Sequence, residues 1–227
     1  MPQAIINGLY ALTPDVANTP ELVAMTRQAL EGGASLVQYR NKAAGSELRR
    51  EQAHALARLC RAFEVPFVIN DHLDLAIDVS ADGVHLGRED TPLTDARRLL
   101  GHSKIIGISC YDRLERAAEA EHHGADYVAF GAFFASVTKP GATPAALDLL
   151  NRAKQELQIP VVAIGGITSD NAAGLIRRGA DAVAVSNALF HASDIRAAAE
   201  DFSRLIKQNK RSKHSIPHHH GLANNVT

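Results

Sequence analysis

The sequence has few of the features that mark secreted, membrane-spanning or nucleic-acid-binding proteins. It contains two cysteines in 227 residues, too few for a disulfide framework or a cysteine-rich zinc site. The formal net charge of -1 provides no general attraction for nucleic acid or acidic membrane surfaces. No apolar run reaches the roughly 18 residues of a membrane span, and residues 1–7 lack the basic and apolar regions of a signal peptide. We therefore expect a cytoplasmic protein with neither nucleic-acid nor membrane partners.

Short runs rich in Val, Ile and Leu alternate with longer amphipathic stretches, a pattern typical of repeated βα units around a parallel sheet. The candidate strands are residues 8–12, 35–39, 67–69, 83–86, 104–108, 127–130, 161–164 and 182–185. Eight parallel strands close a barrel, and α/β barrels of this length form one domain. We predict an α/β fold, a single-domain (β/α)8 TIM barrel, over residues 1–207.

Three of the predicted helices end in similar short sequences, each just before a predicted strand. The segments are Glu31-Gly-Gly-Ala34, His123-Gly-Ala-Asp126 and Arg178-Gly-Ala-Asp181. Glycine suits the left-handed residue that stops a helix, and the following residues lead the chain into the next strand. We interpret these segments as a weak internal repeat of barrel units.

The end of the chain, residues 208–227, is basic and then polar, without a stripe that could face a core. Such a composition predicts a disordered tail. The adjacent residues His218, His219 and His220 are interpreted as incidental rather than as metal ligands.

A buried strand opens into a paired glycine, Gly165-Gly166, and then into a helix start at Thr168. Backbone N–H groups in such a turn and in the first turn of a helix point at an anion and carry partial positive charge. At the seventh and eighth strands of a parallel barrel, this is the usual phosphate-binding position. The alternative is that both glycines only permit a tight turn in a crowded place. We expect a phosphorylated ligand.

Cations follow the second predicted strand. Gln38, Arg40 and Lys42 alternate with period two, so they share one side of an extended chain. An Arg fork and a Lys point charge suit a pyrophosphate next to a polar ring. A solvated basic loop is the alternative.

Carboxylates follow the third and fourth predicted strands, at the same rim. Asp71 and Asp90, with phosphate oxygens and water, would make a typical Mg²⁺ site. Glu89 is a second candidate for a metal ligand. Either Asp could instead cap the helix that follows it.

The loops after the fifth and sixth predicted strands add further polar groups. Ser109 is a candidate donor, and Cys110 beside it is interpreted as a packed thiol rather than a nucleophile. The long segment 131–141 contains two aromatics, two hydroxyls and Lys139 before Pro-Gly, which is typical of a mobile cover over an anionic site.

The order and spacing of these motifs resemble those of the thiamine phosphate synthases, from about Gly8 to Lys207. The matching segments are Gln-x-Arg-x-Lys, Asn70-Asp71, Val84-His-Leu-Gly-x-x-Asp90, Gly107-x-Ser109, Ser136-x-Thr138-Lys139 and Ala163-Ile-Gly-Gly-Ile167. The resemblance implies a Mg²⁺-dependent transferase of thiamine biosynthesis. Such an enzyme joins a pyrimidine-methyl pyrophosphate to a thiazole phosphate, with pyrophosphate leaving first.

The resemblance also implies roles for individual residues. Binding of the pyrimidine pyrophosphate is expected of Gln38, Tyr39, Arg40, Asn41, Lys42, Asn70, Ser109 and Lys139. Among these, Arg40, Lys42, Ser109 and Lys139 are the expected catalytic residues, and Asp71 and Asp90 the expected Mg²⁺ ligands. Binding of the thiazole phosphate is expected of Ser136, Val137, Thr138, Gly166, Ser186 and Asn187, with Val185 as an alternative contact at the end of the eighth strand.

The chain departs from the family pattern in the cover segment, where Ala132 and Ala135 stand at positions commonly occupied by proline. Three alternative functions stay open: a thiazole tautomerase, a non-catalytic barrel that binds a phosphorylated ligand, and a sugar-phosphate isomerase. The tautomerase would not need the pyrophosphate and metal residues together, and no acid-base pair for enolisation stands out. The sequence also leaves homo-oligomer formation open.

Overall fold

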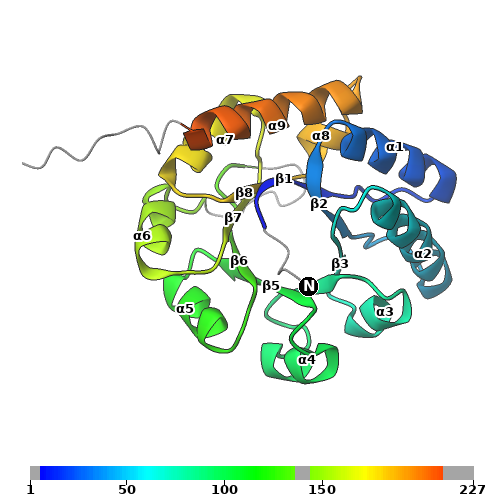
Figure 1. Ribbon diagram of the computed structural model, residues 1–227, viewed down its shortest axis with the longest axis horizontal. Coiled ribbons are helices and arrows are strands. Elements are labelled where there is room, and N and C mark those ends of the chain that lie inside the picture. The colour runs from blue at the N-terminus through cyan, green and yellow to red at the C-terminus, as the bar shows by residue number, and fades with distance from the viewer. Residues whose placement is uncertain (1–5, 136–143, 212–227) are drawn as a thin grey trace, which may run out of the picture.

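The computed structural model describes residues 6–135 and 144–211 and has the predicted architecture. Eight parallel strands form a closed barrel in sequence order, with helices around it (Figure 1). The strands are β1 (Gly8–Leu12), β2 (Ala34–Tyr39), β3 (Phe67–Asn70), β4 (Gly83–Leu86), β5 (Ile105–Tyr111), β6 (Tyr127–Phe130), β7 (Val161–Ile164) and β8 (Ala182–Val185). The helices are α1 (Thr19–Glu31), α2 (Ser46–Ala62), α3 (Leu73–Asp78), α4 (Leu93–Leu100), α5 (Leu114–His122), α6 (Asp148–Glu156), α7 (Ser169–Arg178), α8 (Asn187–Phe190) and α9 (Ile195–Arg211).

Most strand bounds agree with the prediction, but β5 is longer at its carboxyl end. It was expected to stop at residue 108 and instead continues to Tyr111, because Ser109 and Tyr111 still pair with Ala129 and Phe130 of β6. Ser109 therefore belongs to a strand rather than to a loop.

Alternation along the strands separates two apolar layers. Leu9 and Ala11 of β1 belong to the large cluster that includes the helices, whereas Tyr10 and Leu12 belong to a smaller one of strand residues. The smaller cluster fills the barrel interior, as expected of a packed barrel rather than a pore. Polar groups in this interior therefore need partners among its own side chains.

The repeated helix endings have the conformation that the glycines predict. Gly33, Gly124 and Gly179 have φ values of 95°, 87° and 123°, which residues with a side chain rarely adopt. The aspartates after two of these glycines hold the start of a neighbouring strand: Asp126 accepts from the N–H of Ile106 at 2.7 Å, and Asp181 from that of Val161 at 2.9 Å. These segments fix the bottom of the barrel.

The last helix, α9, lies along α7 and α1 (Figure 1). It continues to Arg211, so residues 208–211 are helical and the tail was predicted to begin too early. The sequence pattern did not predict these helical residues, because the periodic apolar positions of α9 stop before the helix ends. The predicted disorder of the later residues falls outside the described chain.

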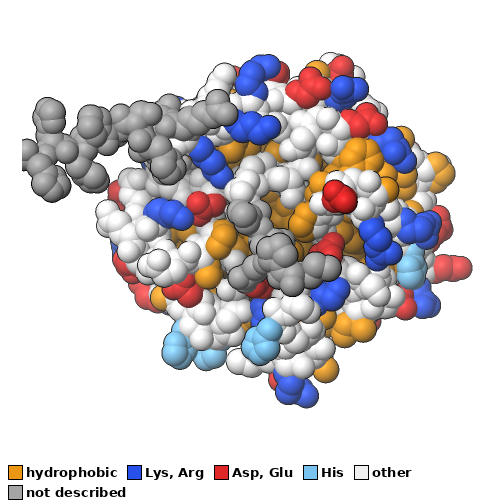
Figure 2. Space-filling view, in the orientation of Figure 1, with side chains coloured by type: hydrophobic (Ala, Val, Ile, Leu, Met, Phe, Trp, Pro, Cys, Tyr) orange, Lys and Arg blue, Asp and Glu red, His pale blue; other side chains and the backbone are white. Residues whose placement is uncertain are grey.

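Within the two described stretches, no helix is both long and apolar enough to cross a membrane. Acidic and basic side chains are interspersed over the face shown in Figure 2.

Candidate active site

The carboxyl ends of β2 and β3 enclose a cavity of about 220 Å³. Its lining residues are Tyr39, Arg40, Asn41, Lys42, Arg49, Ile69, Asn70, Asp71 and His72. The chain segments after two neighbouring strands thus bring together most of the residues predicted for the pyrophosphate side. Parallel strands place their carboxyl ends at one rim, which explains why residues about 30 positions apart in sequence share this cavity.

The backbone after β2 is held by the loop after β1. The Thr13 hydroxyl accepts from the Arg40 N–H at 3.0 Å and donates to the Arg40 carbonyl at 3.1 Å. The Asp15 carboxylate accepts from the Lys42 N–H at 3.1 Å and lies 3.8 Å from the Arg40 guanidinium. These contacts hold the backbone that carries both cations. The exposed Lys42 ammonium is thereby placed at the rim.

Tyr39 and Asn41, both expected to bind substrate, use their polar atoms in the scaffold. The Tyr39 hydroxyl donates to Gln52 at 2.8 Å, and the Asn41 amide donates to Gln52 and to the Val16 carbonyl, both at 3.0 Å. Both side chains are buried. Their visible contribution is to the shape of the loop that carries Arg40 and Lys42.

Asp71 and Asp90 form a pair of half-buried carboxyl groups at the rim. Burial, followed by a hydrogen bond to Asp90 and its charge, raises the pKa of Asp71 to about 6, against the opposing charges of Lys42 and Arg40. Asp90 accepts from the N–H of Gly87 at 2.6 Å. The first residues of α3 and α4 are preceded by His72 and Pro92 as caps, so the alternative that either Asp caps a helix is wrong.

The carboxyl pair fits a hard divalent cation that takes its other ligands from elsewhere. Burial, followed by the neighbouring Asp90 carboxyl, raises the pKa of Asp71 and so disfavours its charged form, whereas a bound cation would favour that form. Among the described residues, no group of three or more His, Cys, Asp or Glu side chains is placed to hold a metal. Mg²⁺ usually keeps several waters and binds one or two carboxylates plus substrate phosphates, so two carboxylates suffice.

Arg49 of α2 lines the same cavity, and the sequence analysis did not single it out. Its Nη2 donates to the Ala44 carbonyl at 2.7 Å. Its Nε is the buried side-chain polar atom that, among the described residues, makes no hydrogen bond. A buried unpaired donor of this kind is rare, and an anion in the cavity would satisfy it. The sequence feature that could have identified Arg49 is its place in the first turn of the helix after β2.

Gln38 and Ser109 are linked through the barrel interior by three other side chains. Gln38 Nε2 donates to the Tyr10 hydroxyl at 2.6 Å, and the hydroxyls of Tyr10 and Tyr127 are 2.7 Å apart. His85 Nδ1 lies 2.9 Å from the Tyr127 hydroxyl, and His85 Nε2 lies 2.9 Å from Ser109 Oγ. Sequence analysis quoted His85 within a motif but missed both tyrosines as polar groups, because their period places them in the core.

The glycine turn after β7 has the predicted left-handed conformation, with φ of 99° at Gly165 and 63° at Gly166. It is also crowded: an added Cβ at Gly165 would lie 2.3 Å from Ala132 Cβ, and one at Gly166 would lie 2.5 Å from the Ala135 carbonyl oxygen. The turn is therefore crowded, as the alternative interpretation expected, and the segment after β6 is what crowds it. An anion-binding role for the same backbone stays a prediction.

At the end of β8, Val185 is buried in the outer layer, while Ser186 is half-buried and Asn187 is exposed. A side-chain contact with a phosphate is thus open to Ser186 and Asn187 but not to Val185. The other residues expected to contact this phosphate, Ser136, Val137 and Thr138, lie outside the described residues, as does Lys139.

Cys110 is buried next to Ser109. Burial raises the pKa of its thiol to about 12, and the charge of Arg116 opposes this only in part. A thiol of this kind is not a nucleophile at neutral pH, which supports its interpretation as a packed side chain.

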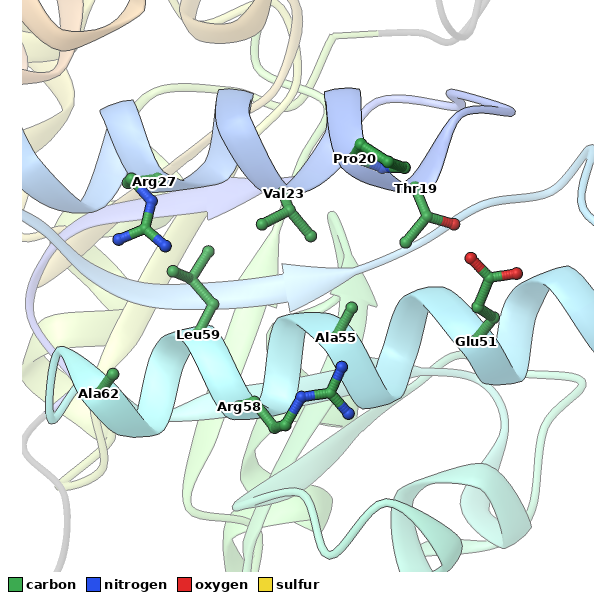
Figure 3. Close-up of a pocket in the computed structure, with 9 residues that line it drawn as sticks. All are labelled: Thr19, Pro20, Val23, Arg27, Glu51, Ala55, Arg58, Leu59 and Ala62. Atoms are coloured by element: carbon green, nitrogen blue, oxygen red, sulfur yellow. The ribbon is translucent and has the colours of Figure 1, made fainter.

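A larger hollow of about 470 Å³ lies between α1 and α2, on the outer wall of the barrel (Figure 3). Val23, Ala55 and Leu59 face one another across it, and Arg27 and Arg58 stand at its edge (Figure 3). It contains no residue from a strand end. We therefore place the active site at the smaller cavity, where the chemistry-bearing side chains converge.

Comparisons with known proteins identify the family of this chain. The sequence model of the family described as Thiamine monophosphate synthase matches residues 9–189. The thiamine-phosphate synthase of Nitrosospira multiformis is 65% identical over 91% of this chain and 88% of its own length. That of Nitrosomonas eutropha is 55% identical over 88% of this chain and 95% of its own length.

A solved structure is similar as well. The thiamine phosphate pyrophosphorylase from Pyrococcus furiosus has a TM-score of 0.80 and 39% sequence identity, covering 89% of this chain and 96% of that chain. The family model matches most of the barrel, and two relatives share more than half of their aligned residues with this chain. The tautomerase, isomerase and non-catalytic alternatives are therefore without support. The chain belongs to the thiamine monophosphate synthase family and is a transferase of thiamine biosynthesis.

Proposed function

We propose that this enzyme joins 4-amino-2-methyl-5-(diphosphooxymethyl)pyrimidine to thiazole phosphate, forming thiamine phosphate and releasing pyrophosphate. The observation that carries the proposal is the cavity at the ends of β2 and β3, where Arg40, Lys42 and Arg49 lie beside Asp71. Three cations next to a carboxyl pair suit a pyrophosphate that brings a divalent cation with it.

On the pyrimidine side, we assign the pyrophosphate to Arg40, Lys42 and Arg49 and the ring to Gln38, Asn70 and Ser109. Tyr39 and Asn41 support the loop after β2. Lys139 completes the cation set in the proposal, although it lies outside the described residues. On the thiazole side, the phosphate is assigned to the turn at Gly166 and to Ser136, Val137, Thr138, Ser186 and Asn187.

Asp71 and Asp90 would hold Mg²⁺, with the remaining ligands from pyrophosphate oxygens and water. When bound, the ion supplies positive charge to the departing pyrophosphate. The cation pair Arg40 and Lys42 would supply further positive charge, on a loop held by Thr13 and Asp15. Because these groups are held in place before the reaction, little reorganisation is needed as charge develops.

The proposed chemistry is dissociative. The bond between the pyrimidine methylene carbon and the pyrophosphate oxygen breaks first, and its electron pair leaves with pyrophosphate. The thiazole nitrogen then donates its lone pair to the methylene carbon of the electron-rich pyrimidine cation. No protein nucleophile is required, which agrees with the buried, unreactive thiol of Cys110.

The test is an assay with both substrates and Mg²⁺ that follows pyrophosphate and thiamine phosphate, with an EDTA control. Equal, Mg²⁺-dependent amounts of the two products are expected. A folded sample that binds thiazole phosphate but forms no product would contradict the proposal and favour a tautomerase or a binding protein.

Substitution of the carboxyl pair tests the metal assignment. Asp71→Asn and Asp90→Asn should each lower kcat/KM by about 100-fold or more and raise the Mg²⁺ concentration needed for half-maximal activity. The matched control is Asp74→Asn, an exposed aspartate in the first turn of α3, which should leave both quantities unchanged. Activity of the wild-type level in both rim variants would remove Asp71 and Asp90 as ligands.

We also propose a cytoplasmic location, since both cysteines are buried free thiols. Assembly into a homo-oligomer stays a prediction, and the mass of the purified protein by light scattering would decide it.

A further inference from the structure

A continuous row of hydrogen-bonding groups crosses the barrel interior from β2 to β5. Its inner members, Tyr10, His85 and Tyr127, are 1%, 6% and 0% exposed. Its outer members, Gln38 and Ser109, are two of the three residues assigned to the pyrimidine ring. All four separations between neighbours are 2.6–2.9 Å. The row therefore connects two substrate contacts through side chains that do not touch the substrate themselves.

The row has a direction, because each hydroxyl has one hydrogen to donate. Gln38 Nε2 can only donate, so the Tyr10 oxygen accepts from it. The hydrogen of Tyr10 then goes to Tyr127, the other hydroxyl within reach. In the opposite direction, with Gln38 Nε2 facing Tyr10 as in this structure, the Tyr10 hydrogen would point at a nitrogen that cannot accept it and would be left unpaired inside the barrel, at a cost of about 1–3 kcal/mol.

The direction of the row also fixes the tautomer of His85. Tyr127 accepts from Tyr10 and donates its own hydrogen to His85 Nδ1. His85 therefore carries its hydrogen on Nε2 and donates it to Ser109 Oγ. Because Nδ1 accepts and Nε2 donates, the ring carries a single N–H and is neutral in this row.

The two ends of the row therefore have opposite hydrogen-bonding roles towards a ligand. Ser109 Oγ accepts from His85, so its own hydrogen is available to a ligand at the mouth. Gln38 uses its amide nitrogen inside the barrel, and among the described residues no group donates to its carbonyl oxygen Oε1. A pyrimidine ring bound between β2 and β5 would therefore meet a hydrogen-bond acceptor at Gln38 and a hydrogen-bond donor at Ser109.

The barrel provides space for this row. An added Cβ at Gly107 would lie 2.0 Å from Cζ of Tyr127, so any larger residue there would displace the Tyr127 ring. The Tyr127 ring also stacks on His85 with centroids 5.6 Å apart and meets Tyr10 edge to face at 6.0 Å. These contacts hold the rings in the orientation that the hydrogen bonds need.

We propose that Tyr10, Tyr127 and His85 are positioning residues that set Gln38 as acceptor and Ser109 as donor, and so select an aminopyrimidine over its oxo analogue. The inference rests on the proposed function for the identity of the ring. An aminopyrimidine offers an amine donor and unprotonated ring nitrogens. In the 4-oxo analogue the amine is replaced by a carbonyl acceptor and a neighbouring ring nitrogen carries hydrogen, so donor and acceptor are exchanged.

The first experiment measures the tautomer in the protein without substrate. In ¹⁵N-histidine-labelled protein, the His85 resonances are identified by their loss in His85→Asn. The expected result is a neutral ring with hydrogen on Nε2 in the wild type and a mixture of tautomers in Tyr127→Phe, where Nδ1 loses its donor. A wild-type ring with hydrogen on Nδ1 would overturn the proposal, because the row would then run the other way.

The second experiment measures substrate choice. Tyr127→Phe should lower the ratio of kcat/KM for the amino substrate to that for the 4-oxo analogue by about 10-fold or more. The matched control is Thr26→Val, which removes another buried hydroxyl, bonded to the Leu22 carbonyl at 2.8 Å within α1, and should leave the ratio unchanged. An unchanged ratio in a folded Tyr127→Phe protein would also overturn the proposal.

The two readouts separate this inference from the proposed function. If the enzyme forms thiamine phosphate but carries the Nδ1 tautomer, the row is wrong and the function stands. If no product forms from either pyrimidine while the Nε2 tautomer is observed, the proposed function fails and the direction of the row stands.

Discussion

At the scale of single residues, neighbouring side chains of the same type have different roles because their surroundings differ. Arg49 faces the cavity with a buried Nε that, within the described chain, has no acceptor. Arg50, the next residue, is on the exposed side of α2 and pairs with Asp78 through two contacts of 2.8 Å. The helix turns by about 100° per residue, so adjacent residues face different ways.

The substitution Arg49→Gln tests the first role. We expect the KM for the pyrimidine pyrophosphate to rise about 10-fold or more, because a charge-assisted contact to the anion is lost. The KM for thiazole phosphate should stay the same. Steady-state kinetics with each substrate varied in turn would measure both.

Arg50→Gln is the control for this prediction, since the exposed pair with Asp78 contributes little. It should change neither KM. An equal rise in both Michaelis constants for Arg49→Gln would indicate a general disturbance of the loop at Ala44 rather than a lost contact with pyrophosphate.

At the scale of elements, the strand starts are tied together on the side opposite the active site. The Asp126 carboxylate accepts from the N–H of Ile106 at 2.7 Å and lies 2.6 Å from Arg97 of α4. Arg97 also donates to the carbonyls of Gly101 and Lys104 at 2.8 and 2.7 Å. This one ion pair therefore joins α4, β5 and the turn before β6.

Asp126→Ala should destabilise the fold without changing the chemistry. The side chains of Arg97 and Asp126 are 12% and 11% exposed, so removing the carboxylate leaves a nearly buried cation and costs about 3 kcal/mol. Urea unfolding would measure this loss, and kcat/KM of the folded variant should match the wild type.

The comparison variant is Asp95→Ala, which breaks the exposed pair with Arg98 at 3.5 Å. Its cost should be below about 0.5 kcal/mol. Similar losses of stability in the two variants would contradict the structural role of the Arg97–Asp126 pair.

At the scale of the whole molecule, the buried His85 and the half-buried Asp71 make stability depend on pH in opposite directions. The pKa of His85 falls to about 4 in the fold because of burial, and that of Asp71 rises to about 6, with burial as the first cause. The unfolded chain binds the His85 proton more readily, and the folded chain binds the Asp71 proton more readily.

For His85, the free energy of unfolding should fall as pH drops from about 6.5 towards 4. In this range the histidine of the unfolded chain binds a proton, whereas the buried ring of the folded chain does not. A shift of this size corresponds to about 3 kcal/mol at most. The difference in unfolding free energy between the wild type and His85→Asn, measured by urea titration from pH 7 to 4, should narrow as pH falls. A constant difference would contradict a buried, neutral His85.

For Asp71 the sign is reversed. The stabilising contribution of its proton is present below the unfolded pKa of about 3.9 and is lost as pH rises through about 6. Asp71→Asn removes this dependence, so the stability of that variant relative to the wild type should increase from pH 4 to 7. Urea titrations at the two ends of this range would measure the change, and a relative stability that falls instead would contradict the raised pKa.

Particular residues show how far sequence reasoning reached. The period-two spacing of Gln38, Arg40 and Lys42 predicted side chains on one side of an extended chain, but β2 ends at Tyr39. Arg40 and Lys42 line the cavity together with Tyr39 and Asn41, whereas Gln38 turns to Tyr10 in the barrel interior. The extension of β5 beyond residue 108 depended on pairing with β6. Arg49 was missed because sequence does not show which of two adjacent arginines faces a cavity.

Periodicity in the sequence predicted the barrel, and the resemblance of its motifs to those of known enzymes indicated the family, since both depend on residues close in sequence or on their order along the chain. Packing in three dimensions decided the rest. It turned Tyr39 and Asn41 towards the scaffold and crowded the Gly165–Gly166 turn. It also joined Gln38 to Ser109 through Tyr10, Tyr127 and His85. Contacts of this kind unite strands far apart in the chain, and they exist only once the barrel has closed.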